Sequence, residues 1–270
     1  MKSPLPRMGL GTWHMGESAS QRAAEVAALR AGIELGLNVI DTAEMYADGG
    51  AEEVVREAIR GRRDDVFVVT KFYPHHATRK ELPRACERSL DRMGVDSIDL
   101  YLMHWRGRVP LAETVEALER LVETGKVERW GVSNFDVEDM EELAAVARMG
   151  GIFADQVLYN PARRGIEFDL LPWCRERNVQ VMAYSPLDEG ALASDRRLAT
   201  IGERIGASAS QVALAWILRQ PGVCAIPKAG SLEHVRDNAK ALELRLDEET
   251  LREIDRIFTP PSRKQRLEII

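Results

Sequence analysis

The chain has 270 residues, 45% of them hydrophobic and 30% charged, and its 37 Lys and Arg against 43 Asp and Glu give a formal net charge of −6. This composition is typical of a globular protein with a large core, and it excludes general disorder. The acidic balance, without a basic stripe, argues against nucleic acid or an acidic membrane surface as a partner.

Short apolar runs with strand character recur from one end of the chain to the other. Eight such runs can be distinguished: MGLGTW near the N-terminus, LGLNVIDT ending at Asp41, DVFVVTK at Lys71, SIDLYLMHW at Trp105, VERWGVSN at Asn134, IFADQV at Gln156, VQVMAYS at Ser185 and VCAIPK at Lys228. Several carry the β-branched and aromatic residues that favour strands.

Segments with apolar residues at helical spacing lie between these runs. Thr78 stands three residues before Glu81, a capping-box pattern that predicts a helix start. Helices are predicted in AAEVAALRAGIELG, in the segment after Thr78, and in LAETVEALERLVETGK, DVEDMEELAAVARMG, DLLPWCRERN, SASQVALAWILRQPG and SLEHVRDNAKAL.

This alternation predicts an α/β fold, a (β/α)8 TIM barrel that forms one domain over residues 1–270. Parallel strands need a crossover helix each time, and about 250 residues is the usual size of such a barrel. The competing fold is a doubly wound open sheet, but no GxGxxG motif follows the first strand. No linker or change of composition divides the chain.

Polar residues gather where the predicted strands end. If the barrel closes, they meet at one mouth, where the active sites of such barrels lie. Each residue alone also has an ordinary explanation, such as a helix cap, a solvated lysine or a hydrogen-bonded histidine at the rim. The set comprises Asp41 with Tyr46, Lys71, His104 with Trp105, Ser133 with Asn134, Gln156, and Tyr184 with Ser185.

Together, these residues and their neighbours resemble the aldo-keto reductase family. The similarity extends to bacterial members that reduce small aldehydes such as methylglyoxal. It is carried in order by GLGTW, DTAEMY, VTK, LYLMHW, GKVERWGVSNF, DQVLYN, VMAYSPL and IPKAGSLEHVRDN.

The resemblance implies a catalytic tetrad of Asp41, Tyr46, Lys71 and His104 that reduces a carbonyl with hydride from NADPH, without a metal. A carbonyl that accepts hydride develops negative charge on oxygen and needs a proton donor, here Tyr46. We expect Lys71 to lower the phenol pKa and Asp41 to hold Lys71. His104 would orient the substrate oxygen.

The resemblance also implies a cofactor site and a substrate wall. Ser133, Asn134 and Gln156 would bind the nicotinamide carboxamide, and Tyr184 would stack on its ring. Ser185 to Leu187 resembles the pyrophosphate loop, and Lys228 beside a helix N-terminus suits the 2′-phosphate. The remaining expected NADP(H) contacts are Gly11, Thr12, Asp41, Pro227, His234 and Asn238, and the expected substrate pocket is Trp13, Tyr46, Tyr73, His104 and Trp105.

The sequence departs from the family pattern in several places. His234 stands where many members carry an Arg that stacks on the adenine, and Ala229 replaces a frequent Ser, so the strength of the preference for NADPH over NADH is open. The segment before GLGTW is short for the usual N-terminal hairpin. The RGRVP loop after His104 is also short, which favours an open pocket.

Two other functions are compatible with such a barrel: a nucleotide-binding regulatory subunit, and an aldolase that uses Lys71 as a Schiff-base nucleophile. The intact tetrad argues against the first, and Asp41, by keeping Lys71 protonated, against the second. The physiological carbonyl substrate is not identified. The C-terminal tail, residues 259–270, is expected near the cavity mouth.

The cysteines and the N-terminal sequence indicate in which cellular compartment the protein is expected. Cys86, Cys174 and Cys224 have no CxxC spacing, so neither a disulfide framework nor a zinc site is predicted. MKSPLPRMGLGTW lacks the apolar run of a signal peptide, and no stretch of about 18 apolar residues occurs. A cytoplasmic location is expected. The oligomeric state is not fixed, and a monomer is compatible with the sequence.

Overall fold

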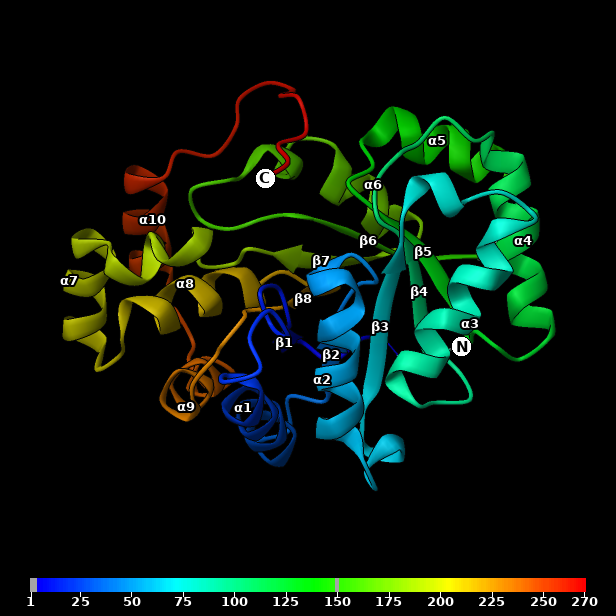
Figure 1. Cartoon of the computed structure of the whole chain (residues 1–270). Coiled ribbons are helices and arrows are strands. Elements are labelled where there is room, and N and C mark those ends of the chain that lie inside the picture. The colour runs from blue at the N-terminus through cyan, green and yellow to red at the C-terminus, as the bar shows by residue number, and fades with distance from the viewer. Residues whose placement is uncertain (1–3, 149–150) are drawn as a thin grey trace.

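The computed structural model describes residues 4–148 and 151–270 and shows eight parallel strands that pair in chain order, from β1 to β8. Helices surround the sheet (Figure 1). The strands are β1 Gly9–Gly11, β2 Val39–Asp41, β3 Phe67–Phe72, β4 Leu100–Met103, β5 Trp130–Ser133, β6 Ile152–Leu158, β7 Gln180–Tyr184 and β8 Val223–Ala225.

The sheet closes through contacts between its first and last strands. Met8 bridges to Ala225, and Gly11 bridges to Lys228. The Gly11 N–H donates to the Pro227 carbonyl at 3.1 Å, and the Ala225 N–H donates to the Arg7 carbonyl at 2.9 Å. The predicted (β/α)8 fold is therefore confirmed, as a nearly closed barrel.

Ten α-helices are found in the described residues, and they cover the outside of the barrel. They are α1 Arg22–Glu34, α2 Gly50–Ile59, α3 Glu81–Met93, α4 Leu111–Glu123, α5 Val137–Val146, α6 Leu170–Glu176, α7 Arg196–Ile205, α8 Ala209–Leu218, α9 Leu232–Lys240 and α10 Glu248–Ile257. The last two residues of the predicted segment DVEDMEELAAVARMG lie outside the described residues.

Three of these helices, α2, α7 and α10, lie outside the segments predicted to be helical. Start signals for two of them are present in the sequence, because Asp195 and Asp247 cap α7 and α10 with their carboxylates. Helix α2 has no capping side chain and follows Gly49, whose φ of 91° is left-handed. Only half of the predicted capping box forms at α3, where Thr78 Oγ1 accepts from the Glu81 N–H at 3.1 Å.

Apolar side chains fill both the space between sheet and helices and the inside of the barrel. Leu5 belongs to the inner cluster, so the irregular segment before β1 contributes to closing the barrel floor. The Arg129 guanidinium lies over the rings of Phe67 and Phe153, near the amino ends of β3 and β6, at 5.3 and 4.6 Å. The floor is thus packed, and the open end is the one where the strands finish. None of the described helices is long and apolar enough to cross a membrane.

Candidate active site

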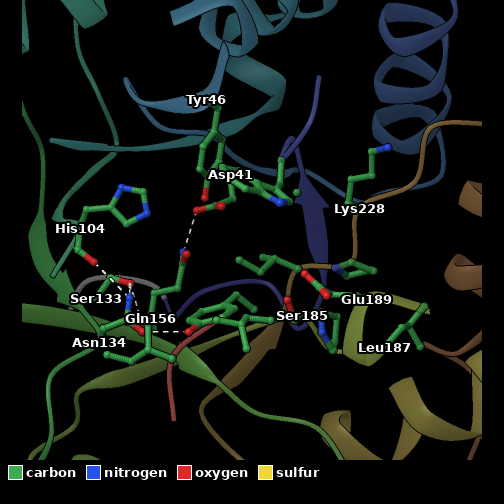
Figure 2. A pocket seen from close by; sticks show the side chains of 18 of the residues that line it. Asp41, Tyr46, His104, Ser133, Asn134, Gln156, Ser185, Leu187, Glu189 and Lys228 are labelled. Atoms are coloured by element: carbon green, nitrogen blue, oxygen red, sulfur yellow. Dashed lines mark hydrogen bonds between the residues drawn. The ribbon is translucent and has the colours of Figure 1, made fainter. Parts of the chain in front are cut away.

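A cavity of about 1310 Å³ opens at the carboxyl ends of the strands. Pockets for drug-sized ligands usually measure roughly 300–1,000 Å³, so this one has room for a larger molecule or for two molecules together. Figure 2 shows Asp41, Tyr46, His104, Asn134 and Gln156 gathered at one part of its wall.

Lys71 stands at the centre of a buried hydrogen-bond network. It comes from β3, has no exposed surface, and donates from Nζ to Asp41 Oδ2 at 2.8 Å, to the Thr42 carbonyl at 2.8 Å and to the Tyr46 hydroxyl at 3.2 Å. Gln156 Nε2 donates to the other carboxylate oxygen of Asp41 at 2.7 Å. The side chain of Lys71 is therefore held with its charge directed at the phenol.

Burial and charge act on this network in opposite directions. Burial lowers the pKa of Lys71, but the nearby Asp41 and Tyr46 outweigh it, so the pKa is raised and the side chain is a cation at neutral pH. Burial raises the pKa of Tyr46, and Lys71 offsets only part of this rise. Lys71 thus lowers the phenol pKa, as expected from the sequence, but the net direction is upward because the fold buries the phenol, which the sequence pattern did not predict.

His104 follows β4 and lines the same wall. Its ring centroid lies 5.8 Å from that of Tyr46, and its main-chain N–H donates to the Phe72 carbonyl at 3.1 Å. Burial, followed by the charge of Lys71, lowers the pKa of His104 to about 2. The imidazole is therefore neutral near pH 7 and can offer one N–H to a ligand.

A second network joins the ends of β5, β6 and β7. The Tyr184 hydroxyl donates to Asn134 Oδ1 at 2.9 Å, and Ser133 Oγ donates to the Gln156 carbonyl at 2.7 Å. Asn134 has a left-handed φ of 61°, a conformation that Asn tolerates better than most residues. The ends of β5 and β7 thus place an amide, a hydroxyl and an aromatic ring on one side of the cavity.

At the opposite end of the cavity, the lining comes from the loop after β7 and from α9. Ser185 and Leu187 line it from the loop, and Pro227, Lys228, His234 and Asn238 from the β8–α9 region. Lys228 is exposed and makes no side-chain ion pair with the described residues. Ser231 caps α9, and its Oγ accepts from the His234 N–H at 3.3 Å.

Three residues predicted for the site are not among those that line the cavity, namely the buried Lys71 described above, Thr12 and Tyr73. Thr12 is fully buried, and its hydroxyl donates to the main-chain carbonyl of Asp41 at 3.0 Å. Tyr73 packs edge-on against Trp105, at 6.0 Å between ring centroids, and Trp105 itself lines the wall. Position in the sequence alone could not show that Thr12 and Tyr73 lie behind the residues that line the cavity. The predicted residues Trp13 and Gly11 do line it.

The C-terminal tail contributes lining residues that the sequence did not identify individually, namely Arg266, Leu267, Ile269 and Ile270. Ion pairs bind the tail to the barrel: Arg163 to Glu268 at 2.7 Å, and Lys264 to Asp169 at 3.5 Å. Further lining residues that were not predicted include Met45, Arg106 and Glu189. The sequence could have indicated these three residues only through their closeness to the predicted residues Tyr46, Trp105 and Leu187.

A barrel with a Tyr, Lys, Asp and His set at its mouth is the arrangement of a carbonyl-reducing class of enzymes, and comparison with known proteins gives the same class. A sequence profile described as "Aldo/keto reductase family" matches residues 7–258. The chain belongs to the aldo-keto reductase family, as the resemblance in its sequence indicated.

Individual relatives narrow the comparison. The chain is 49% identical over 271 aligned positions to the methylglyoxal reductase YeaE of Escherichia coli, covering 98% of this chain and 95% of that protein. It is 34% identical to the glyoxal reductase of Bacillus subtilis, covering 93% and 88%. An aldo/keto reductase from Klebsiella pneumoniae, crystallised with NADP and acetate, has 54% identity and a TM-score of 0.97, covering 98% and 96%.

Proposed function

We propose that this protein reduces small aldehydes and dicarbonyls to alcohols with NADPH, and that Tyr46 is the proton donor. The observation that carries the proposal is the buried Lys71 ammonium 3.2 Å from the Tyr46 hydroxyl, at the wall of a cavity large enough for a dinucleotide beside a small substrate. The relatives named for methylglyoxal and glyoxal reduction support the substrate class.

The chemical groups along the cavity fit a pyridine dinucleotide phosphate. Asn134 and Gln156 carry amides that can pair with a carboxamide, and Tyr184 offers a ring for stacking. Lys228, near the start of α9, suits a phosphate. When bound, NADPH supplies the hydride that a carbonyl carbon accepts.

The protein's own residues supply the proton and stabilise the charge. Because its pKa is raised, Tyr46 carries its proton at neutral pH and can transfer it to the carbonyl oxygen as negative charge develops there. The Lys71 ammonium stabilises the resulting phenolate across the 3.2 Å contact. Asp41 keeps Lys71 charged and fixed in place.

His104 has a separate role in this proposal. A neutral imidazole can donate one hydrogen bond to the carbonyl oxygen, which orients the substrate without competing with Tyr46 as the acid. The low pKa of His104, about 2, supports this assignment because the ring does not take up a proton in the working pH range.

The two alternative functions have less support. A Schiff-base aldolase needs an unprotonated lysine, whereas the pKa of Lys71 is raised. A purely regulatory barrel would not need the buried Asp41, Lys71 and Tyr46 network.

We also propose a single domain over residues 1–270 with the tail 259–270 near the mouth, a monomeric state and a cytoplasmic location. The three cysteines are buried and free, which is compatible with a reducing compartment.

The direct test is a screen of NADPH oxidation by the purified protein against methylglyoxal, glyoxal, simple aldehydes and aldoses. Reduction of at least the small aldehydes at rates well above those without enzyme is expected. Absence of turnover with every carbonyl, together with unimpaired NADPH binding, would favour the regulatory barrel. Borohydride trapping of a carbonyl on Lys71 would favour the aldolase. Size-exclusion chromatography tests the monomeric state.

A further inference from the structure

One buried carboxylate at the mouth has no part in the chemistry above. Glu44 lies in the segment after β2, two residues before Tyr46, and is only 7% exposed. Its Oε1 accepts from the Tyr73 N–H at 2.7 Å and lies 2.8 Å from His76 Nδ1, while Oε2 lies 3.8 Å from Arg88. Burying a carboxylate costs free energy, which its partners must offset. The position of Glu44 therefore calls for an explanation.

These contacts connect the two segments that carry the proton donor and its cation. The Glu44 main-chain N–H donates to the Lys71 carbonyl at 3.1 Å, and its side chain holds the main chain of Tyr73, two residues after Lys71. Glu44 therefore fastens the segment of Tyr46 to the end of β3 through both its main chain and its side chain.

The Tyr46 segment needs such an anchor because its backbone is irregular. Ala47 and Asp48, directly after Tyr46, have left-handed φ values of 50° and 51°. Residues other than Gly in this region cost about 1–3 kcal/mol each and persist only when surrounding contacts impose them. Lys71, in contrast, sits in a paired strand. Of the two groups, the phenol is the one that depends on loop contacts for its position.

We propose that Glu44 is a positioning residue, which acts through Tyr46 by holding the segment that places the phenol hydroxyl against Lys71 and the substrate oxygen. The inference rests on the proposed function, since it assigns the effect to proton transfer from Tyr46. Glu44 itself lies outside the set of residues that line the cavity.

The chain offers a matched control in Glu52, on α2. Glu52 is also buried, accepts a hydrogen bond from Thr70 Oγ1 at 2.6 Å and pairs with Arg92 at 2.5 Å. It joins α2 to β3 and α3, as Glu44 joins its segment to β3 and the residues that follow. Replacement of either carboxylate by Met removes comparable polar contacts, but only Glu44 is tied to the segment just before Tyr46.

The experiment is a double-mutant cycle. Glu44→Met and Glu52→Met are each made alone and in a Tyr46→Phe background, and single-turnover reduction of methylglyoxal is measured with NADPH bound. Glu44→Met is expected to slow reduction about tenfold in the wild-type background, because small displacements of a catalytic group are costly. It should cause no further loss when Tyr46→Phe has already removed the acid. Glu52→Met should leave the rate unchanged.

Two further readouts separate positioning from general loss of structure. With Glu44→Met, the pH profile of alcohol oxidation should move to higher pH, since a displaced phenol loses the stabilisation from Lys71. NADPH affinity should stay at the wild-type value. If Glu44→Met does not fold, Glu44→Asp takes its place in the same cycle, because its carboxylate falls one methylene short of the Tyr73 N–H.

An equal loss of rate from Glu44→Met and Glu52→Met, or the same loss from Glu44→Met with and without the Tyr46 hydroxyl, would overturn the inference. So would a wild-type rate and pH profile in the Glu44 variant. Failure of the proposed function has a different signature, because the wild-type protein itself would then not reduce methylglyoxal or any other carbonyl with NADPH.

Discussion

The two ends of the cavity hold their cations in opposite ways. Lys71, at the tetrad end, is fully buried and donates hydrogen bonds to three oxygens, whereas Lys228, at the α9 end, is exposed and has no side-chain ion pair within the described residues. A reaction centre benefits from groups fixed before the substrate arrives, because no free energy is then lost to reorganisation. A phosphate site needs only a cation within reach.

The sharpest test of the tetrad end is Tyr46→Phe. The variant removes one hydroxyl and leaves the aromatic contact with Trp13, now 4.8 Å between ring centroids, essentially intact. Turnover should fall by about 10² or more, the usual scale for loss of a general acid, with little change in cofactor affinity. The measurement is kcat on a substrate whose chemical step limits the rate, and retention of over half of the activity would remove Tyr46 from the role.

Lys71→Met tests whether the charge of Lys71 controls the pKa of Tyr46, because Met fills a similar volume without the charge. Burial already raises the pKa of Tyr46, and Lys71 is the group that opposes this rise. Without the cation, the phenol pKa rises further, so alcohol oxidation, which needs phenolate character, should be lost below about pH 9. The pH profile of oxidation measures this directly. An unchanged profile would contradict the account of Lys71.

At the α9 end, Lys228→Ala should weaken NADPH binding much more than NADH binding. A charged hydrogen bond to phosphate is worth roughly 1.5–3 kcal/mol, or about 10 to 100-fold in affinity. Dissociation constants for both cofactors, measured by fluorescence titration, give the ratio. If the wild-type kcat/KM with NADH already equals that with NADPH at pH 7, Lys228 does not bind the 2′-phosphate.

The burial of His104 predicts how stability depends on pH. Its pKa in the folded state is about 2, whereas a histidine in the unfolded chain titrates near 6.5, so between these values only the unfolded state takes up the proton. Stability should therefore fall as the pH drops below about 6.5, by up to about 1.4 kcal/mol per pH unit from this group. Urea unfolding of wild type and His104→Gln at two pH values tests this, and the variant should show a shallower fall.

The smallest effect is expected at His234, which lines the cavity at the α9 end. An Arg is charged at every pH and presents five N–H donors to a phosphate, whereas an imidazole presents at most two. His234→Arg should thus raise NADPH affinity several-fold at pH 8, on the order of 1 kcal/mol. Dissociation constants of NADPH and NADH for the wild type and the variant measure this change. An NADPH affinity in His234→Arg equal to that of the wild type would place residue 234 away from the phosphate.

The sequence by itself determined the fold class and about half of the residues that line the cavity. Alternating strand and helix patterns leave few ways to arrange parallel strands, and polar residues at strand ends must then share one mouth. Asp41, Lys71, His104 and Gln156 could be named because each closes an apolar run or stands next to its end. The same reasoning placed Thr12 and Tyr73 in the lining, because position along a strand does not say which side chains are covered by their neighbours.

Only the tertiary structure decided how charge is balanced within the site. Burial raises the pKa of Tyr46 against the pull of Lys71, and it lowers that of His104 to about 2, because the free energy of a charge depends on how much water the fold removes from it. The contacts of Glu44 with Tyr73 and His76 join segments about 30 residues apart. No local pattern encodes them, since they exist only once two neighbouring strands of the barrel have paired.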